Sequence, residues 1–268
     1  MSAVHPTAIV DPSAEIDPSV SVGPYAVIGE DVVIGADSVI GAHATVEFTH
    51  MGKKNRLLPG CHVGGPPQDL KYVGEKTRLV MGDKNIVREC VTLNRGTNAT
   101  GETRIGSGCL FMAYSHVAHD CRFGDGVILV NSVGVAGHVE IGDHSVIGGL
   151  VGVHQFVRIG RLCMVSGGSM VGKDIPSFCT AQGDRARLRG LNLIGMRRAG
   201  FSREAMGAVK DAYKTLFGAG LAIETALATL KTNNPTPEVL EMVEFIERSP
   251  RGLTRPAAAD QEEEEATL

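Results

Sequence analysis

The chain has 268 residues, with 34 glycines, no tryptophan, 4% aromatic residues and 43% hydrophobic residues. This composition is too apolar for a disordered chain, no apolar run approaches the roughly 18 residues of a membrane-spanning helix, and no Gly-X-Y period indicates collagen. The formal net charge is -4, but residues 260–265 carry five of the acidic groups, so the remainder is close to neutral. We expect neither a nucleic-acid partner nor stable insertion into a membrane.

The N-terminal segment, MSAVHP, has neither a basic region nor an apolar core, so we expect no signal peptide. The six cysteines include no CxxC pair. In a chain of this size without a secretory signal they indicate reduced thiols, most of them small buried residues. These features together predict a cytoplasmic protein.

From Val4 onwards the sequence repeats with a period of six residues. Eight apolar residues between Val4 and Val46 are in strict register, and most are followed by Gly or Asp. The register then slips by one residue, resumes over 51–63 and 81–93, and runs unbroken through twelve hexads from Ile105 to Val171. A short strand followed by a tight corner, eased by Gly or Asp, explains this period.

Three such strands would close one triangular coil of eighteen residues, and stacked coils would pair their backbones about 4.8 Å apart. Each coil would then bury its apolar residues only against its neighbours. A narrow interior of this kind favours Val and Ile over Trp, which accounts for the composition. The fold class predicted is therefore mainly β, a parallel β-helix of hexapeptide repeats.

Two segments interrupt the hexads without changing their phase, at about 64–78 and about 95–104. The flanking apolar positions are 18 residues apart in the first case and 12 in the second, both multiples of six. We expect two loops that leave a continuous helix of strands. Long loops commonly carry function.

The C-terminal third has a different pattern. After Val171 the hexads stop, and an Arg-rich stretch is followed by helical spacing. Ser202 is expected to cap a helix that ends near Gly218, a second helix is expected at about 221–230, and a third over 236–248 with proline in its first turn.

These patterns divide the chain into three parts. We predict the β-helix over 1–184, a small α-helical domain over 185–254, and an acidic tail over 255–268. The tail is Ala-rich and charged, so we expect it to be disordered and to contribute mainly solubility.

Five of the nine histidines fall between residues 116 and 154. Taken singly, each is more often a packing or surface residue than a catalyst. The eighteen-residue coil, however, places His119, Gly137 and Gln155 at equivalent positions, so they should stack on one edge with His138 and His154 beside them. Imidazoles, an exposed glycine backbone and an amide on one edge form a candidate catalytic site.

The motifs of several enzyme classes are missing from the sequence. It has no GxSxG elbow, P-loop or dinucleotide fingerprint, so covalent serine chemistry and phosphoryl transfer have no support. A histidine base without a partner nucleophile suits direct attack of a substrate hydroxyl on an activated carbonyl, such as a thioester. Asp120 could orient His119, although neighbours on a strand normally point to opposite faces.

Several longer segments are similar to the UDP-N-acetylglucosamine O-acyltransferase family, over about residues 4 to 254. They are QDLKY at 68–72, NRGT at 94–97, HVAHDC at 116–121, AGHV at 136–139, VHQF at 153–156, AQG at 181–183, Asn192 and RRAGFSRE at 197–204. The resemblance implies a left-handed β-helix and a homotrimer with sites between subunits. It also implies transfer of a (R)-3-hydroxyacyl group from acyl carrier protein to the 3-position of UDP-N-acetylglucosamine, the first step of lipid A biosynthesis, with no cofactor and no metal.

The same resemblance implies a role for each matching residue. His119 is the general base, Asp120 supports it, and the Gly137 N–H helps to hold the oxyanion. The residues that line the sugar and acyl end are Asp69, Lys71, His116 and His138. The residues that hold the nucleotide are His154, Gln155, Asn192 and Arg198. Gly167 falls at the position of the acyl-chain ruler, where glycine leaves room for a long chain, with Ser166, Ser169 and Met170 also shaping the groove.

Other interpretations stay open at this point. His116, His119 and His138 could imitate the three zinc ligands of γ-type carbonic anhydrases, which share hexapeptide coils, although the C-terminal helices would then have no role. A non-catalytic scaffold would make the histidines incidental. Asn94 stands where many family members carry His, which leaves the choice between a 3-hydroxyl and a 3-amino acceptor sugar open. Two interpretations of the Arg-rich stretch are equally open: a binding surface for an acidic carrier protein, or an ordinary solvent-exposed surface.

Overall fold

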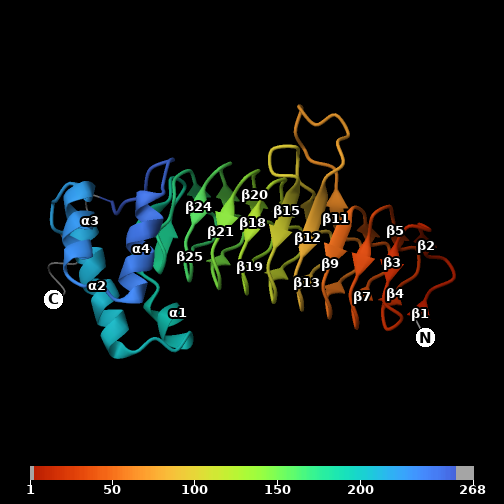
Figure 1. Ribbon diagram of the computed structural model, residues 1–268, viewed down its shortest axis with the longest axis horizontal. Helices are drawn as coiled ribbons and strands as arrows, with labels where there is room; N and C mark the ends of the chain where they lie inside the picture. The colour runs from red at the N-terminus through yellow and green to blue at the C-terminus, as the bar shows by residue number, and fades with distance from the viewer. Residues whose placement is uncertain (1–2, 258–268) are drawn as a thin grey trace.

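The computed structural model describes residues 3–257, which form a long prism of short strands followed by a cluster of helices (Figure 1). The strands make three sheets, one on each face of the prism. The first sheet runs in the order β1 (Ala3–Val4), β4 (Ser21–Val22), β7 (Val39–Ile40), β10 (Arg56–Leu57), β13 (Ile86–Val87), β16 (Leu110–Phe111), β19 (Ile128–Leu129), β22 (Val146–Ile147), β25 (Met164–Val165), β27 (Cys179–Gln182) and β28 (Arg187–Leu191).

The other two sheets contain only parallel neighbours within the described residues. The second sheet runs in the order β2 (Ile9–Val10), β5 (Val27–Ile28), β8 (Thr45–Val46), β11 (His62–Gly65), β14 (Thr92–Asn94), β17 (His116–Val117), β20 (Gly134–Val135), β23 (Gly152–Val153) and β26 (Met170–Val171). The third runs in the order β3 (Glu15–Ile16), β6 (Val33–Ile34), β9 (Thr49–Met51), β12 (Arg78–Met81), β15 (Glu102–Ile105), β18 (Arg122–Phe123), β21 (Glu140–Ile141) and β24 (Arg158–Ile159).

The apolar hexad residues from Val22 onwards form the core, as predicted, whereas Val4 and Val10 of the first coil are 38% and 36% exposed. Strands of successive coils pair eighteen residues apart, so Val117, Val135 and Val153 stack directly above one another in β17, β20 and β23. Each of these three side chains is at most 3% exposed. The fold is a parallel β-helix, left-handed as the resemblance implies, and its interior is one layer of Val, Ile and Leu, with Phe111 and Phe123 as buried rings 6.0 Å apart.

Glycine was expected to ease the corners, and Gly108 and Gly126 do so with φ angles of 68° and 65°, but the glycines that follow the inward apolar residues are required for another reason. The corner residues with left-handed backbone include Tyr114, Leu150 and Phe156, whose φ angles are 63°, 60° and 65°. The glycine that follows the inward apolar residue has an ordinary φ, but a Cβ on Gly35 would lie 2.6 Å from the carbonyl carbon of Gly52 in the next coil. Close approach of stacked backbones, rather than turn conformation, requires glycine there.

Both interruptions of the hexads leave the stack intact, as predicted. Strand β12 pairs with β9 on one side and β15 on the other, so the segments 66–77 and 95–101 project as loops from a continuous sheet (Figure 1). Arg95 connects the two loops, because its guanidinium donates to the Tyr72 hydroxyl at 2.8 Å and to the Gly64 carbonyl at 2.8 Å.

Four helices follow the prism within the described residues: α1 (Leu193–Arg198), α2 (Arg203–Phe217), α3 (Ile223–Thr232) and α4 (Pro237–Glu247). The predicted Ser202 cap is confirmed, since it accepts from the Ala205 N–H, and Thr236, the predicted start of the last helix, accepts from the Val239 N–H. The region after residue 184 differs from the helical expectation at its start. There β28 folds back antiparallel on β27 and extends the first sheet before α1 begins.

The helices are attached to the last coils by specific contacts. Arg161 donates to Glu241 of α4 at 2.8 Å, and its guanidinium lies over the ring of Phe178. None of the helices in residues 3–257 combines the length and apolarity needed to cross a membrane. The tail expected from residue 255 lies, from 258 onwards, outside the described residues.

Candidate active site

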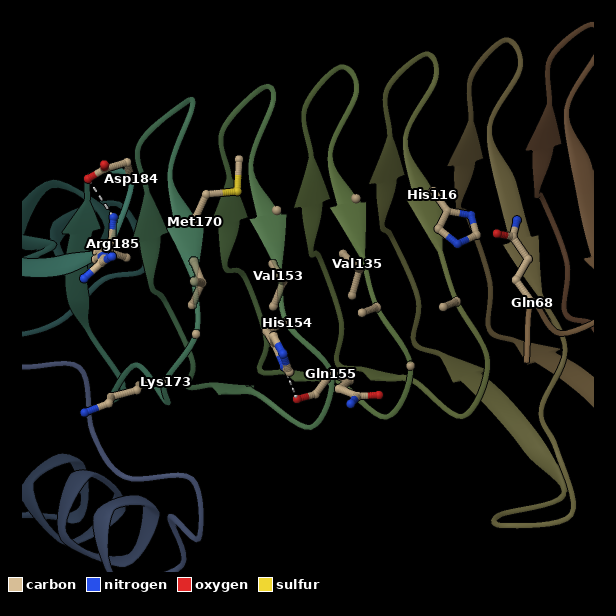
Figure 2. A pocket seen from close by; sticks show the side chains of 18 of the residues that line it. Gln68, His116, Val135, Val153, His154, Gln155, Met170, Lys173, Asp184 and Arg185 are labelled. Carbon is tan, nitrogen blue, oxygen red and sulfur yellow. Dashed lines mark hydrogen bonds between the residues drawn. The ribbon is translucent and has the colours of Figure 1, made fainter. Parts of the chain in front are cut away.

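A groove of about 920 Å³ runs along the face of the second sheet (Figure 2). It begins at Gln68, His116 and His119, crosses β20, β23 and β26, and ends at residues 184–187. The groove therefore follows the prism axis over several stacked coils, with the predicted histidine edge along one side.

His119 and Asp120 form a hydrogen-bonded pair at the corner after β17. Their side chains do not point to opposite faces, because Asp120 has a left-handed backbone with a φ of 61° and the strand has already ended. His119 Nδ1 donates to Asp120 Oδ2 at 2.7 Å. With the proton held on Nδ1, the Nε2 lone pair of His119 is available as a proton acceptor.

The Asp120 carboxylate is fully buried and is held by the loop 95–101. It accepts from the Thr97 N–H at 3.0 Å, from the Thr97 hydroxyl at 2.7 Å, and from the Thr100 hydroxyl. Burial by itself raises the pKa of Asp120, but the hydrogen bonds from Thr100, His119 and Thr97 together outweigh it and leave the pKa below its ordinary value. Asp120 is therefore ionised and can stabilise a positive charge on His119.

Two further imidazoles lie beside this pair. His138 Nε2 is 3.6 Å from Asp120 Oδ2, and the His138 ring stacks on Phe156 at 4.5 Å. His116 Nδ1 lies 2.7 Å from the Thr92 hydroxyl. Burial lowers the pKa of both histidines; the nearby His119 lowers each further, while Asp120 and Asp69 partly oppose the shift at His138. Both rings are thus neutral near pH 7 and suit hydrogen bonding to a polar substrate.

Gly137 lies directly above His119, as the eighteen-residue period predicts. A Cβ built on Gly137 would be 2.6 Å from His119 Cε1 and 2.8 Å from Nε2, so no other residue fits without moving the imidazole. The neighbouring amides are bonded, Ala136 N–H to Val153 and His138 N–H to His119. Within residues 3–257, nothing accepts the Gly137 N–H, which leaves an unpaired donor on a residue that lines the groove beside His119.

Some of the remaining predicted residues line the groove and others lie outside its lining. His154 and Gln155 line the groove and are exposed (Figure 2). Asp69 is half-buried on the loop 66–77 close enough to affect His138, whereas Lys71 on the same loop is exposed and outside the lining.

Three predicted residues lie away from this groove. Asn192 caps α1, accepting from the Gly195 N–H at 3.0 Å and donating to the Leu162 carbonyl at 2.9 Å. Arg198 is exposed at the end of α1. Gly167 is at an exposed corner, next to Gly149 of the preceding coil.

Sequence reasoning missed two groups of residues. Gly134 and Gly152 form the groove floor at successive coils above His116, and Met170, already expected to shape the groove, follows them in the same register. Adding eighteen repeatedly to 116 would have found them. The threonines that hold Asp120 carry no such signal, because they belong to an inserted loop outside the hexad count.

One cluster in residues 3–257 has the composition of a metal site: His119, Asp120 and His138 have ligand atoms within 4.8 Å of one another. It differs from the three-histidine set considered above, because His116 is not a member. Thr97 and Thr100 already occupy lone pairs of the carboxylate. The arrangement is better explained as an ionised carboxylate that orients the His119 imidazole.

Stacked hexapeptide coils with a histidine–aspartate pair on one edge define a transferase of the hexapeptide-repeat class, and residues 13–47 match the family described as bacterial transferase hexapeptide. Residues 174–254 match the family described as UDP-N-acetylglucosamine O-acyltransferase, domain 2. A relative from Anaeromyxobacter sp. (strain Fw109-5), acyl-[acyl-carrier-protein]–UDP-N-acetylglucosamine O-acyltransferase, is 51% identical over 77% of this chain and 81% of its own length. The chain belongs to the UDP-N-acetylglucosamine O-acyltransferase family.

Further relatives agree in sequence and in structure. The protein of the same name from Chlorobaculum tepidum is 55% identical over 73% of this chain and 75% of its own length. The crystal structure of UDP-N-acetylglucosamine O-acyltransferase from Moraxella catarrhalis has a TM-score of 0.92 at 43% identity, covering 94% of this chain and 100% of that one. The structure from Acinetobacter baumannii has the same TM-score at 42% identity, covering 95% of this chain and 100% of that one.

Proposed function

We propose that this chain transfers a (R)-3-hydroxyacyl group from acyl carrier protein to the 3-hydroxyl of UDP-N-acetylglucosamine, the first step of lipid A biosynthesis. The observation that carries the proposal is the His119–Asp120 pair in the groove with the unpartnered Gly137 N–H directly beside it. Family membership supports the choice of donor and acceptor, because the relatives are named for this reaction.

In the proposed reaction, His119 Nε2 takes the proton of the sugar hydroxyl as its oxygen bonds to the thioester carbon. The carbonyl oxygen becomes an oxyanion that accepts a hydrogen bond from the Gly137 N–H. The carbon–sulfur bond then breaks, and the carrier thiolate takes the proton back from the imidazolium. Asp120 stabilises the imidazolium through its hydrogen bond to Nδ1. A general base contributes roughly 10²–10⁴-fold and one oxyanion donor roughly 10²–10³-fold.

The other predicted residues would bind the two substrates. We propose that Asp69, Lys71, His116 and His138 contact the sugar and the acyl end. We further propose that the nucleotide is held by His154, Gln155, Asn192 and Arg198. The last two do not line the groove of their own chain. A neighbouring copy would therefore have to supply them.

This requirement favours a homotrimer with sites between subunits. The exposed apolar side chains of Leu70 and Val73 on the loop 66–77, and of Tyr114 and Leu150 along one edge, are available for such contacts. Sedimentation of the purified protein would test the trimer. A monomer that is fully active would refute it.

We also propose a cytoplasmic location and a division of work along the chain. All six cysteines are free thiols and five are buried, which suits a reducing compartment. Burial raises the pKa of the Cys61 thiol to about 12, so it is unreactive. In the proposed division, 1–184 carries the catalytic edge, and 185–254 supplies a basic surface for the acidic carrier protein.

The test is transfer of a labelled hydroxyacyl group to UDP-N-acetylglucosamine by His119→Ala. We expect a loss of about 100-fold or more with the fold and subunit assembly unchanged. His144→Ala is the matched control, because His144 is an exposed corner histidine outside the groove lining. Near-normal transfer by His119→Ala would refute the base assignment.

Two other outcomes would favour the alternative functions. Stoichiometric zinc in the purified protein together with CO2 hydration would favour a carbonic-anhydrase activity, and binding of neither substrate would favour a scaffold. Running the assay with the 3-amino sugar as well would identify the acceptor.

A further inference from the structure

The loop 66–77 brings two polar side chains to the histidine end of the groove. Gln68 lines the groove there together with His116 (Figure 2). Burial lowers the pKa of His138, and Asp69 of the same loop is close enough to oppose this shift in part. The contribution of this loop to the groove therefore depends on how the loop is held.

The first part of the loop has few polar attachments to the prism, from which it projects (Figure 1). Inside the loop, the Tyr72 N–H donates to the Asp69 carbonyl at 3.0 Å. Among the described residues, every hydrogen bond that joins residues 66–73 to a residue outside the loop runs between Tyr72 and Arg95. One guanidinium thus makes the polar attachment of the segment that carries Gln68 and Asp69.

Arg95 is buried between the loop and the coil beneath it, with 8% of the residue exposed. Its guanidinium donates to the Tyr72 hydroxyl at 2.8 and 3.3 Å and to the Gly64 carbonyl at 2.8 Å. It also lies over two rings, 4.5 Å from the centre of Phe48 and 5.5 Å from that of Tyr72. The Tyr72 hydroxyl in turn donates to the Glu75 carbonyl at 3.1 Å, so the attachment continues into the later part of the loop.

The coil residues beneath Arg95 belong to the irregular part of the repeat. The hexad register slips by one residue between Val46 and Met51, and the shortened corner contains Phe48. Gly64 has a left-handed backbone with a φ of 78°, and a Cβ there would overlap the Glu47 carbonyl, so glycine is required. The departure from the regular stack thus forms the surface on which the guanidinium lies.

The contacts of Arg95 require arginine rather than any cation. The carboxylate of Glu47 is 3.8 Å away and its side chain is 41% exposed, so no close ion pair holds the buried charge. Hydrogen bonds and ring faces hold it instead. A lysine ammonium lacks the planar fork and cannot bond Gly64 and Tyr72 in the same way. Arg95→Lys therefore keeps the charge and removes the attachment.

We propose that Arg95 is a positioning residue for the acceptor sugar nucleotide, an inference that rests on the proposed acyltransferase function. By holding Tyr72, Arg95 fixes the first part of the loop 66–77. Gln68 and Asp69 are thereby kept at the histidine end of the groove, where the sugar would bind.

The loop that holds Asp120 is attached separately. The Gly96 N–H donates to the Arg78 carbonyl at 3.2 Å, and the Arg78 N–H donates to the Gly101 carbonyl at 3.1 Å. These backbone bonds tie the loop 95–101 to β12 without the Arg95 side chain. Loss of the guanidinium should therefore weaken binding of the acceptor and leave the rate of transfer at saturation nearly unchanged.

The first experiment measures steady-state transfer with varied UDP-N-acetylglucosamine and with varied hydroxyacyl carrier. Arg95→Lys should raise KM for the sugar nucleotide about tenfold, the effect of losing one or two hydrogen bonds, with kcat within about twofold and KM for the carrier unchanged. Tyr72→Phe keeps the ring beside the guanidinium and removes the hydroxyl, so it should raise the same KM. The double variant should be no worse than Arg95→Lys, because both changes remove one contact.

Arg104→Lys is the matched control. Arg104 lies on β15, directly after the loop 95–101, and its guanidinium pairs with Glu102 of its own strand at 2.6 Å. This substitution makes the same chemical change close to the same loop without touching Tyr72. Both KM values and kcat should remain those of the wild type.

The second experiment needs no substrate, so it separates this proposal from the proposed function. Amide hydrogen exchange of residues 66–73 should become about tenfold faster in Arg95→Lys and in Tyr72→Phe, and should not change in Arg104→Lys. Tyr72→Phe, which retains the buried guanidinium, carries both experiments if Arg95→Lys fails to fold.

Three outcomes would overturn the positioning role. One is wild-type exchange of residues 66–73 in both variants, and another is faster exchange with an unchanged KM for the sugar nucleotide. The third is a general structural effect, in which Arg95→Lys changes both KM values and the melting temperature while Tyr72→Phe behaves as the wild type. Failure of the wild type to transfer any acyl group would refute the proposed function and the acceptor role together, and exchange would still decide whether Arg95 holds the loop.

Discussion

Replacing Gly137 with alanine tests the proposed geometry of the base most directly. The new Cβ would lie 2.6 Å from His119 Cε1, whereas carbon atoms in contact prefer about 3.5 Å, so the imidazole must move by about 1 Å. His119 cannot retreat freely, because its Nδ1 is held by the buried Asp120 at 2.7 Å. A 1 Å misplacement of a catalytic group costs about 100-fold in rate.

We therefore expect Gly137→Ala to lower kcat about 100-fold with little change in KM. Stability should change little, since Gly137 does not have a left-handed backbone. The assay is steady-state transfer of a labelled hydroxyacyl group, with thermal unfolding as a check of the fold. Gly149→Ala is the matched control: it is also a corner glycine that precedes a left-handed residue, but its Cβ would meet only Asn131 O at 3.3 Å and Val130 at 3.5 Å. A kcat within a few-fold of wild type for Gly137→Ala would refute this placement of the base.

Three further substitutions follow from the same contacts. Asp120→Asn should lower kcat by at least about 100-fold, because the amide cannot stabilise an imidazolium as a carboxylate does; an unchanged kcat would exclude Asp120 as its partner. The pKa of Asp120 is lowered in the folded chain, so its carboxylate stabilises the fold above the ordinary value of 3.8 and loses this effect as the pH falls through the lowered value. Denaturant unfolding between about pH 2 and 6 should therefore show a steeper acid loss for the wild type than for Asp120→Asn, and parallel curves would contradict the shift. Thr100→Val should raise the pKa of Asp120 and lower kcat about tenfold, with recovery in Thr100→Ser; equal effects of Val and Ser would mean that the hydroxyl is not the cause. Asn192→Ala should cost about 1 kcal/mol through loss of the α1 cap, measured by urea unfolding, and a specific rise in KM for the sugar nucleotide would separate the proposed binding role from the cap.

Glycine is required in this protein for three separate physical reasons. In the hexads, glycine allows stacked coils to approach, as at Gly35. At Gly137 it leaves room for an imidazole, and at Gly134 it leaves open space on the groove floor. The glycine-rich composition therefore describes both the β-helix and the site on its edge.

The period of six residues was sufficient to predict the β-helix, its core and the stacking of Gly137 on His119. This succeeded because each coil contacts only its neighbours, so that sequence separation translates directly into spatial position. The caps at Ser202 and Thr236 were also predictable, since they depend on local hydrogen bonds.

Only the tertiary structure decided how the Asp120 carboxylate is held. The left-handed corner turns Asp120 towards His119, and the inserted loop brings Thr97 and Thr100 onto its oxygens. Neither arrangement could be predicted from the six-residue repeat. An inserted loop has no fixed position in the stack of coils, and a corner reverses the alternation of side chains along a strand. The sequence by itself thus determined the scaffold and the position of His119, whereas packing of the inserted loop determined the ionisation state of Asp120.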